Sequence, residues 1–253
     1  SSSNAISGAQ TVKADTYATV AEATTISGLT KAVTYSIKDT SANLAGAGGN
    51  SLSEARIVHF SDQANTTQFN TVNAATQGEL VLLLGIADDV VKYSDANGNA
   101  TTALTDLNTE DPDCVITVND VANVAQFDAI NAKTTSNVIL AGGVKDVVTK
   151  FAAANGTATA SLTAMTTQDE DVAITITDTV NVAQATTIAN ATTGTVVFEG
   201  GVTDTLANLA SSGSVTSGTT TIVTHDPDVL ITVSGTLDGN DVADLNAITA
   251  STT

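Results

Sequence analysis

The chain has 253 residues, of which 42% are hydrophobic and only 14% are charged. Acidic residues outnumber basic ones by 27 to 8, which gives a formal net charge of −19 at pH 7. This charge argues against nucleic-acid binding and against anionic membrane surfaces, because nucleic-acid binding depends on Lys and Arg meeting phosphate. It fits a protein that stays soluble in salt or collects cations. No stretch approaches the roughly 20 apolar residues of a membrane helix, so membrane insertion is not expected.

One sequence phrase recurs along the chain at an almost constant interval. It reads VNVAQATTIANATTG at 181–195, NVAQFDAINAKTTS at 123–136 and NTTQFNTVNAATQG at 65–78. Aligning the copies gives repeats that start at Arg56, Cys114, Val172 and Val229, at spacings of 58, 58 and 57 residues. A fixed period of this length is typical of stacked-repeat architectures. We therefore expect one repeat array over residues 1–253, with repeats at about 6–55, 56–113, 114–171 and 172–228 and a partial one at 229–253.

Each full repeat is expected to open with a strand and continue with a short helix. The opening runs IVHF, CVITV, VAITI and VLITV alternate Val and Ile with other residues, a period of two that favours a strand. The helical phrase VAQFDAINA follows, and its apolar residues Val124, Phe127 and Ile130 fall on one stripe of a helix. Aspartates stand between strand and helix at equivalent positions in three repeats: Asp62, Asp120 and Asp178.

The second half of each repeat is expected to follow the same scheme. Its strands are LVLLLG, NVILAGG and TVVFEGG, and each is followed by an aspartate and a further helical stripe. An aspartate directly before an apolar periodic run predicts a helix N-cap, because its carboxylate accepts the unpaired amides of the first turn. The four residues to which this prediction applies are Asp39, Asp88, Asp146 and Asp204.

The order strand, helix, strand, helix predicts an α/β fold. Parallel strands need crossover connections, which helices supply. No single repeat can bury its apolar face alone, so stacked β-α-β-α repeats of about 58 residues are expected to form a solenoid with one continuous core. An open Rossmann-like α/β sheet is the alternative, and it ranks second because it requires no self-similarity at this interval.

Acidic turns close three successive repeats and are the candidate metal site. They read DPD at 111–113, DED at 169–171 and DPD at 226–228. In a solenoid, equivalent carboxylates stack in rows, and a Ca²⁺ ion between carboxylate and carbonyl oxygens would relieve their repulsion. The alternative is a solvated acidic turn that caps the next strand. The candidate ligands are Asp111, Asp113, Asp169, Asp171, Asp226 and Asp228.

Few other residues suggest chemistry. The two histidines, His59 and His225, have no imidazole counterparts in the other repeats, so no enzymatic activity is expected. Cys114 is the single cysteine, which excludes an internal disulfide and predicts a small buried residue near a strand start. Exposed aromatic residues would be needed for glycan binding. The candidates are Tyr17, Tyr35 and Tyr93, which do not align with one another in the repeats.

Three segments resemble a known group of bacterial proteins. They are IKDTSANLAGA at 37–47, ITDTVNVAQATTIANATTGTV at 176–196 and VTDTLANLAS at 202–211. Similar phrases recur in very large, acidic, Thr/Ala/Val-rich extracellular proteins of cyanobacteria and marine bacteria, which are described as surface-layer, adhesin-like or filament-like. The resemblance implies a secreted or cell-surface location and a structural role, and it supplies no catalytic residue.

These observations predict an extracellular structural repeat protein, a building block of a surface layer, an extracellular filament or an adhesin stalk. Solenoid ends without caps expose strand edges, so end-to-end or lateral self-association is the expected partnership. A carbohydrate- or surface-binding adhesion module, which would recognise cell-surface glycans, is one alternative. A phage fibre or capsid decoration protein is another. Ca²⁺ is the one cofactor considered.

Overall fold

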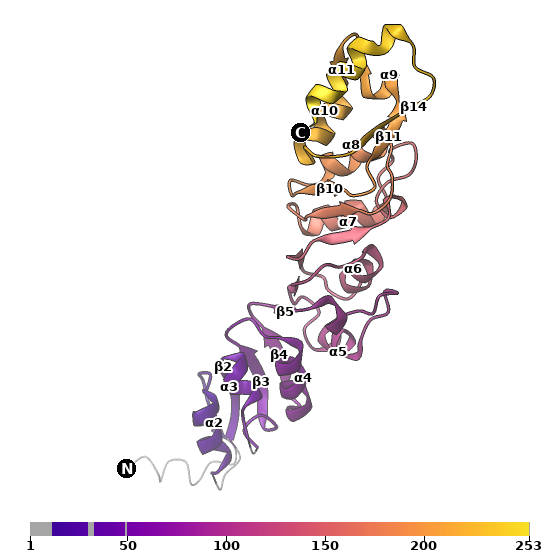
Figure 1. Ribbon diagram of the computed structural model, residues 1–253. Helices are drawn as coiled ribbons and strands as arrows, with labels where there is room; N and C mark the ends of the chain where they lie inside the picture. Colours follow the sequence, from indigo (N-terminus) through magenta and orange to yellow (C-terminus); the bar gives the residue numbers. More distant parts are fainter. Residues whose placement is uncertain (1–11, 30–32, 49, 253) are drawn as a thin grey trace. The chain divides into compact units, whose positions relative to one another are not determined.

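The computed structural model describes residues 12–29, 33–48 and 50–252 (Figure 1). Within them the fold is mixed α/β, with ten α-helices and several short sheets, most of them parallel. None of the described sheets closes into a barrel. The chain divides into two compact units: unit 1 holds residues 1–95, 99–117 and 129–137, and unit 2 holds 96–98, 118–128 and 138–253. Residues 6–11 of the first expected repeat lie outside the described residues.

Unit 1 contains a four-stranded parallel sheet in the order β1-β2-β3-β4. Its strands are β1 Val12–Lys13, β2 Val33–Asp39, β3 Ala55–Phe60 and β4 Glu79–Leu82. The helices that connect them are α2 Val20–Ser27, α3 Ser41–Ala45 and α4 Thr66–Ala75, and α3 lies beside α4 (Figure 1). The chain then continues through β5 Ile86–Asp88, the 3₁₀ helix η1 Val90–Lys92 and α5 Thr102–Glu110. Strand β6 Ile116–Val118 and helix α6 Val124–Asn131 have residues in both units.

Unit 2 contains a three-stranded parallel sheet, a two-stranded parallel pair and a short antiparallel hairpin. The three-stranded sheet has the order β10-β9-β8, the parallel pair is β11-β14, and the hairpin is β12-β13. The strands are β7 Val138–Leu140, β8 Val144–Asp146, β9 Ile174–Ile176, β10 Val196–Phe198, β11 Val202–Thr205, β12 Ala210–Ser211, β13 Ser214–Val215 and β14 Ile231–Ser234. The helices are η2 Val148–Lys150, α7 Ala160–Gln168, α8 Val182–Ala191, α9 Leu206–Leu209, α10 Ser217–His225, η3 Gly239–Asp241 and α11 Val242–Ser251.

The alternating runs form strands because one side of each can be buried. Ile174 and Ile176 of β9 are buried, whereas Thr175 between them is half-buried. The expected opening strands are confirmed as β3, β6, β9 and β14, and the recurring helical phrase is confirmed as α4, α6 and α8. The stripe predicted in α6 is also confirmed, because Val124, Phe127 and Ile130 are all buried.

The polar turn that ends each helical phrase is held by one threonine hydroxyl. In unit 2, Thr192 Oγ1 donates to the carbonyl of Val172 at 2.7 Å and accepts from the amide of Gly194 at 2.9 Å. In unit 1, Thr134 makes the same pair of bonds, with the carbonyl of Cys114 and the amide of Ser136. The hydroxyl replaces backbone partners in a tight turn, which explains why a threonine recurs at this point.

A glycine follows the strand that opens the second half of two repeats, because the backbone requires it there. Gly143 and Gly201 have φ of 75° and 70°, in the left-handed region. A Cβ on either residue would lie 2.7 Å from a backbone carbonyl oxygen, that of Ala173 or Leu230. Only glycine satisfies both conditions, and the strands β8 and β11 begin directly after it.

Three helices and three strands that recur in the repeats were not predicted from the sequence, and neither was the hairpin β12-β13. The helices α5, α7 and α10 come before the acidic turns, and the strands β5, β8 and β11 follow the glycine turns. The expected helical stripes after Asp88, Asp146 and Asp204 are much shorter than predicted, because they form only η1, η2 and the four-residue α9. The extra helices are rich in threonine and serine, residues with weak helix propensity, so they gave no strong periodic signal.

Candidate functional site

Aspartates at strand ends bind the first amides of helices that lie earlier in the chain. In unit 2, Asp146 Oδ2 accepts the backbone amide of Val124 at 3.1 Å, and Asp204 Oδ2 accepts that of Val182 at 3.0 Å. Val124 and Val182 are the first residues of α6 and α8. The donor precedes the acceptor by 22 residues in both cases. These carboxylates therefore neutralise orphan amides at the positive end of a helix dipole.

Unit 1 contains the same bond twice. Asp88 Oδ2 accepts the amide of Thr66 at 3.1 Å and also its hydroxyl, and Asp39 Oδ2 accepts the amide of Val20 at 3.0 Å. Burial is the largest influence on the pKa of Asp39 and acts to raise it. Hydrogen bonds from Asn43, Val20 and Thr40 together outweigh burial, so the pKa is lowered from its ordinary value.

The predicted N-cap role of these four aspartates is wrong in position. The N-cap positions of the following segments lie one residue later, and only the first of them makes a side-chain cap bond: Thr40, Asp89, Val147 and Thr205. Each aspartate does accept the backbone amide of that next residue through its Oδ1. Parallel pairing explains the difference, because it places each strand end beside the entry to an earlier helix. Isolated bridges join Ala122 to Val144 and Val180 to Val202, two residues before each aspartate.

The aspartates of the first half-repeats make a similar contact. In unit 1, Asp62 Oδ1 accepts the amide of Ser41, the first residue of α3, at 2.6 Å. In unit 2, Asp178 Oδ1 accepts the amide of Val148, the first residue of η2, at 2.6 Å. These positions are recognisable as equivalent in the sequence, but their partners are not.

The acidic turns hold a different arrangement, at the C-terminal ends of helices. Asp111, Asp169 and Asp226 are the C-cap residues of α5, α7 and α10. Each carboxylate accepts one strand amide at 2.6 Å, from the third or fourth residue of a strand: Leu82 of β4, Leu140 of β7 and Phe198 of β10. The first aspartate of each turn therefore fixes a helix end to a strand.

The second aspartates of these turns lie in solvent beside the first. Asp113, Asp171 and Asp228 are exposed, whereas Asp111 and Asp226 are buried and Asp169 is partly buried. Burial raises the pKa of Asp111 to about 6, and the neighbouring carboxyls of Asp113 and Glu79 also raise it, while the hydrogen bond from the Leu82 amide lowers it. Burial likewise raises the pKa of Asp169 and Asp226, with added contributions from Asp171 and Asp228.

The predicted calcium ligands are thus placed in three separate carboxyl pairs. One oxygen of each first aspartate is already bonded to an amide, and Ca²⁺ takes six to eight oxygen ligands. Over residues 12–29, 33–48 and 50–252, no group of three or more His, Cys, Asp or Glu side chains is positioned to hold a metal ion. A calcium site here stays a prediction that needs further ligands from carbonyl groups or water.

Two of the three candidate glycan-binding tyrosines were assigned wrongly. Tyr35 and Tyr93 are buried, and the Tyr35 hydroxyl donates to the Ser51 carbonyl at 2.8 Å. Tyr17 is half exposed, and its ring meets the His59 ring edge-on at a centroid distance of 4.5 Å. The imidazole Nε2 of His59 is buried and has no hydrogen-bond partner among the described residues. Burial, followed by the charge of Lys38, lowers the pKa of His59, while Glu79 acts in the opposite direction.

Cys114 is buried, as predicted, and lies two residues before β6. Burial raises the pKa of its thiol to about 12, and Asp111 and Asp113 add to the shift. A thiol with this pKa stays protonated at neutral pH, so it is a poor nucleophile and a poor metal ligand.

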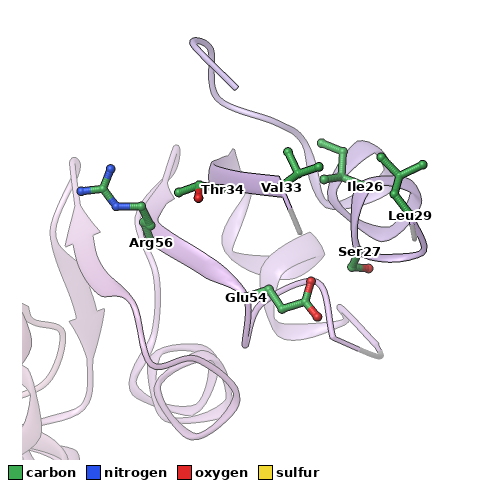
Figure 2. Close-up of a pocket in the computed structure, with 7 residues that line it drawn as sticks. All are labelled: Ile26, Ser27, Leu29, Val33, Thr34, Glu54 and Arg56. Atoms are coloured by element: carbon green, nitrogen blue, oxygen red, sulfur yellow. The ribbon is translucent and has the colours of Figure 1, made fainter. Parts of the chain in front are cut away.

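A hollow of about 530 Å³ lies in unit 1, between the end of α2 and the strands β2 and β3. Figure 2 shows Ile26 and Leu29 on one side and Arg56 on the other, with Glu54 between them. Seven residues line it: Ile26, Ser27, Leu29, Val33, Thr34, Glu54 and Arg56. The group contains one acid and one base and no imidazole or thiol, so this hollow lacks a converging set of catalytic groups.

Comparison with known proteins finds no match to this chain among family models, curated proteins or solved structures. Within the described part of the chain, no helix combines the length and the apolar character that crossing a bilayer requires.

Proposed function

We propose that this chain is an extracellular structural protein whose repeats stack as an α/β solenoid and assemble into a surface layer, a filament or an adhesin stalk. The observation that carries the proposal is the recurrence of the same hydrogen bonds at the repeat interval. The bond from Val124 to Asp146 recurs from Val182 to Asp204, and the bond from Leu82 to Asp111 recurs from Leu140 to Asp169.

These recurring bonds support a stacked array because they connect near neighbours only. Each joins residues 22 or 29 positions apart, which is about half a repeat. In a solenoid each repeat contacts only the adjacent ones, and length is added without a new kind of contact. A protein built around one functional pocket does not require hydrogen bonds that recur at a fixed interval, whereas a long, regular surface does.

Strand β14 has room to pair with one further strand. Strand β9 pairs in parallel with β8 on one side and β10 on the other. Strand β14, its equivalent in the next repeat, pairs only with β11 among the described residues. In β9 the amide of Ile174 donates to the carbonyl of Thr195 at 2.9 Å, so the equivalent amide of Ile231 points away from β11. Such an amide is a template for another parallel strand, whether a further repeat of the same array or a second copy of the chain supplies it.

Negative-stain electron microscopy of the purified chain over a range of concentrations tests the proposal. We expect rods or filaments, which Ile231→Pro should abolish because proline removes the edge amide while remaining tolerated on an edge strand. Ile231→Val keeps the amide and is the matched control. A chain that stays monomeric at every concentration would rule out assembly through this segment. If filaments still form with Ile231→Pro, the chains assemble through an interface other than the edge of β14.

A further inference from the structure

A buried nitrogen atom in unit 1 has no hydrogen-bond partner among the described residues. It is Nε2 of His59, a half-buried residue of strand β3. Lys38 of β2 and Val81 of β4 lie beside His59 in the parallel register. In the other repeats a threonine occupies the equivalent position: Thr117, Thr175 and Thr232. Because buried polar atoms are almost always hydrogen-bonded, this nitrogen requires an explanation.

The ring of Tyr17 packs against this imidazole from the solvent side. The two ring centroids are 4.5 Å apart, the ring planes meet at 66°, and Tyr17 itself is 50% exposed. The backbone beside Tyr17 is fixed to β2, because the amide of Ala18 donates to the carbonyl of Ser36 at 2.8 Å and that of Lys38 donates to Ala18 at 2.9 Å. The backbone is therefore held in place, while the tyrosine ring can turn outward about its side-chain bonds.

The surroundings of His59 disfavour a positive charge on its ring. Burial is the largest influence on the pKa of His59 and lowers it. The charge of Lys38 lowers it further, and Glu79 on β4 acts in the opposite direction, so that the pKa lies below its ordinary value. The other charged residues on β1, α2, β2 and β3 and in the segment before α2 are Lys13, Asp15, Glu22, Asp39 and Arg56.

We propose that Tyr17 is a pH-dependent cover: its ring lies over His59 while the imidazole is neutral and leaves when the imidazole takes up a proton. An imidazolium carries an N–H on both nitrogens, whereas a neutral imidazole carries one. With the cover in place, a protonated Nε2 would be a buried, charged donor without an acceptor, which is strongly disfavoured. When the ring turns outward, water can accept that hydrogen bond. The proton comes from water, and the cover operates within one chain whether or not chains assemble.

The direction of the pH effect on stability follows from the lowered pKa of His59. The unfolded chain takes up a proton at the ordinary histidine pKa of about 6.5, whereas the folded chain does so only at a lower pH. The stability that depends on the neutral imidazole is therefore complete above about pH 6.5 and is lost as the pH falls toward the lowered pKa. Acidification should open the cover and weaken the fold of unit 1 together.

NMR spectroscopy of the natural chain tests the proposal directly. The imidazole signals of His59, assigned with His59→Gln, give its pKa, and nuclear Overhauser effects between the rings of Tyr17 and His59 report whether the cover is closed. We expect a pKa below the ordinary value, with ring-to-ring effects present about one pH unit above it and lost about one unit below it. Effects that persist below the pKa, or a pKa at or above the ordinary value, would overturn the proposal.

Two variants at Tyr17 separate the role of the ring from that of its hydroxyl. Tyr17→Ala removes the cover, so water reaches Nε2 and the pKa of His59 should rise by at least about half a pH unit. Tyr17→Phe keeps the ring and is the matched control, in which this pKa should stay as in the natural chain. Since Tyr17 is half exposed, both variants should fold. The same pKa in Tyr17→Ala as in the natural chain would show that another group buries Nε2, and the proposal would be wrong.

Discussion

Two sets of aspartates in this protein lie in opposite electrostatic environments. The strand-end set, Asp39, Asp88, Asp146 and Asp204, lies at helix N-termini and accepts only from amide and hydroxyl groups. The helix-end set, Asp111, Asp169 and Asp226, lies at helix C-termini and has a second carboxyl beside it. The first position favours a negative charge and the second disfavours it. The role of an acidic residue is therefore decided by the helix end it faces, rather than by the local density of acidic residues.

The largest expected effect comes from removing a strand-end carboxylate. Asp204 accepts from the amides of Val182 and Thr205 and from the side chain of Asn208. Asp204→Ala should lower the free energy of unfolding by ~3 kcal/mol in urea titrations, because charged hydrogen bonds are lost and amides stay unpaired. Asp204→Asn, which keeps one acceptor, should lose about half as much. Equal losses in the two variants would show that geometry, rather than charge, dominates at this position.

A helix-end aspartate should respond differently to the same two substitutions. Asp226→Ala removes the partner of the Phe198 amide and should lower the free energy of unfolding by ~2 kcal/mol at pH 7. Asp226→Asn keeps that acceptor and removes the repulsion with Asp228, so it should match or exceed the natural chain in stability. An asparagine variant as unstable as the alanine one would contradict the comparison between the two sets.

Calcium should distinguish the two sets further, because only the helix-end set has a second carboxyl beside it. At pH 7 and a concentration ten times its Kd, calcium should stabilise the chain by about 1.4 kcal/mol for each site that it occupies. The readout is the melting temperature with calcium and with chelator. The variant Asp113→Asn, Asp171→Asn and Asp228→Asn should lose this response, since it removes the exposed carboxyl of each turn. If calcium does not change the melting temperature of the natural chain, the predicted calcium site in these turns is wrong.

The smallest expected effect is at an exposed ion pair that belongs to neither set. Lys145 and Glu199 meet at 2.7 Å in unit 2, and both side chains are nearly half exposed. Such pairs contribute little in water, so Lys145→Met should change the free energy of unfolding by no more than about 0.5 kcal/mol. A loss as large as that of Asp204→Ala would mean that this exposed ion pair contributes as much to stability as the amide bonds of Asp204.

The sequence was sufficient to predict the α/β class, the opening strands and the recurring helices, because these have strong apolar periodicity. It was insufficient for α5, α7 and α10, whose few apolar residues are separated by threonines. A capping signal was present: Thr101 and Thr159 accept the amides of Leu104 and Leu162, three positions later. A threonine three residues before a leucine could have located both helix starts.

The partners of the aspartates could not be predicted, because they depend on parallel strand register. The sequence shows that Asp146 precedes an apolar run, and local reasoning assigns its carboxylate to the next helix. One of its oxygens does accept the amide of Val147, but only the parallel bridge from Ala122 to Val144 places the other beside the start of α6. Likewise, the acidic turns were recognised as a row of charges, but the helix ends and strand amides that bind their first aspartates were not visible in the sequence.

The span of the carboxylate ties also bears on how this chain reaches its native state. The strand-end bonds close loops of 19 to 22 residues and the helix-end bonds close loops of 28 or 29. The entropy of closing a loop grows only with the logarithm of its length, so these closures have similar cost. Chains dominated by such short-range contacts fold quickly. Each carboxylate–amide bond, once formed, also brings the ends of the next loop closer together. Folding can therefore begin at more than one repeat and proceed to the neighbouring repeats by closing one short loop after another.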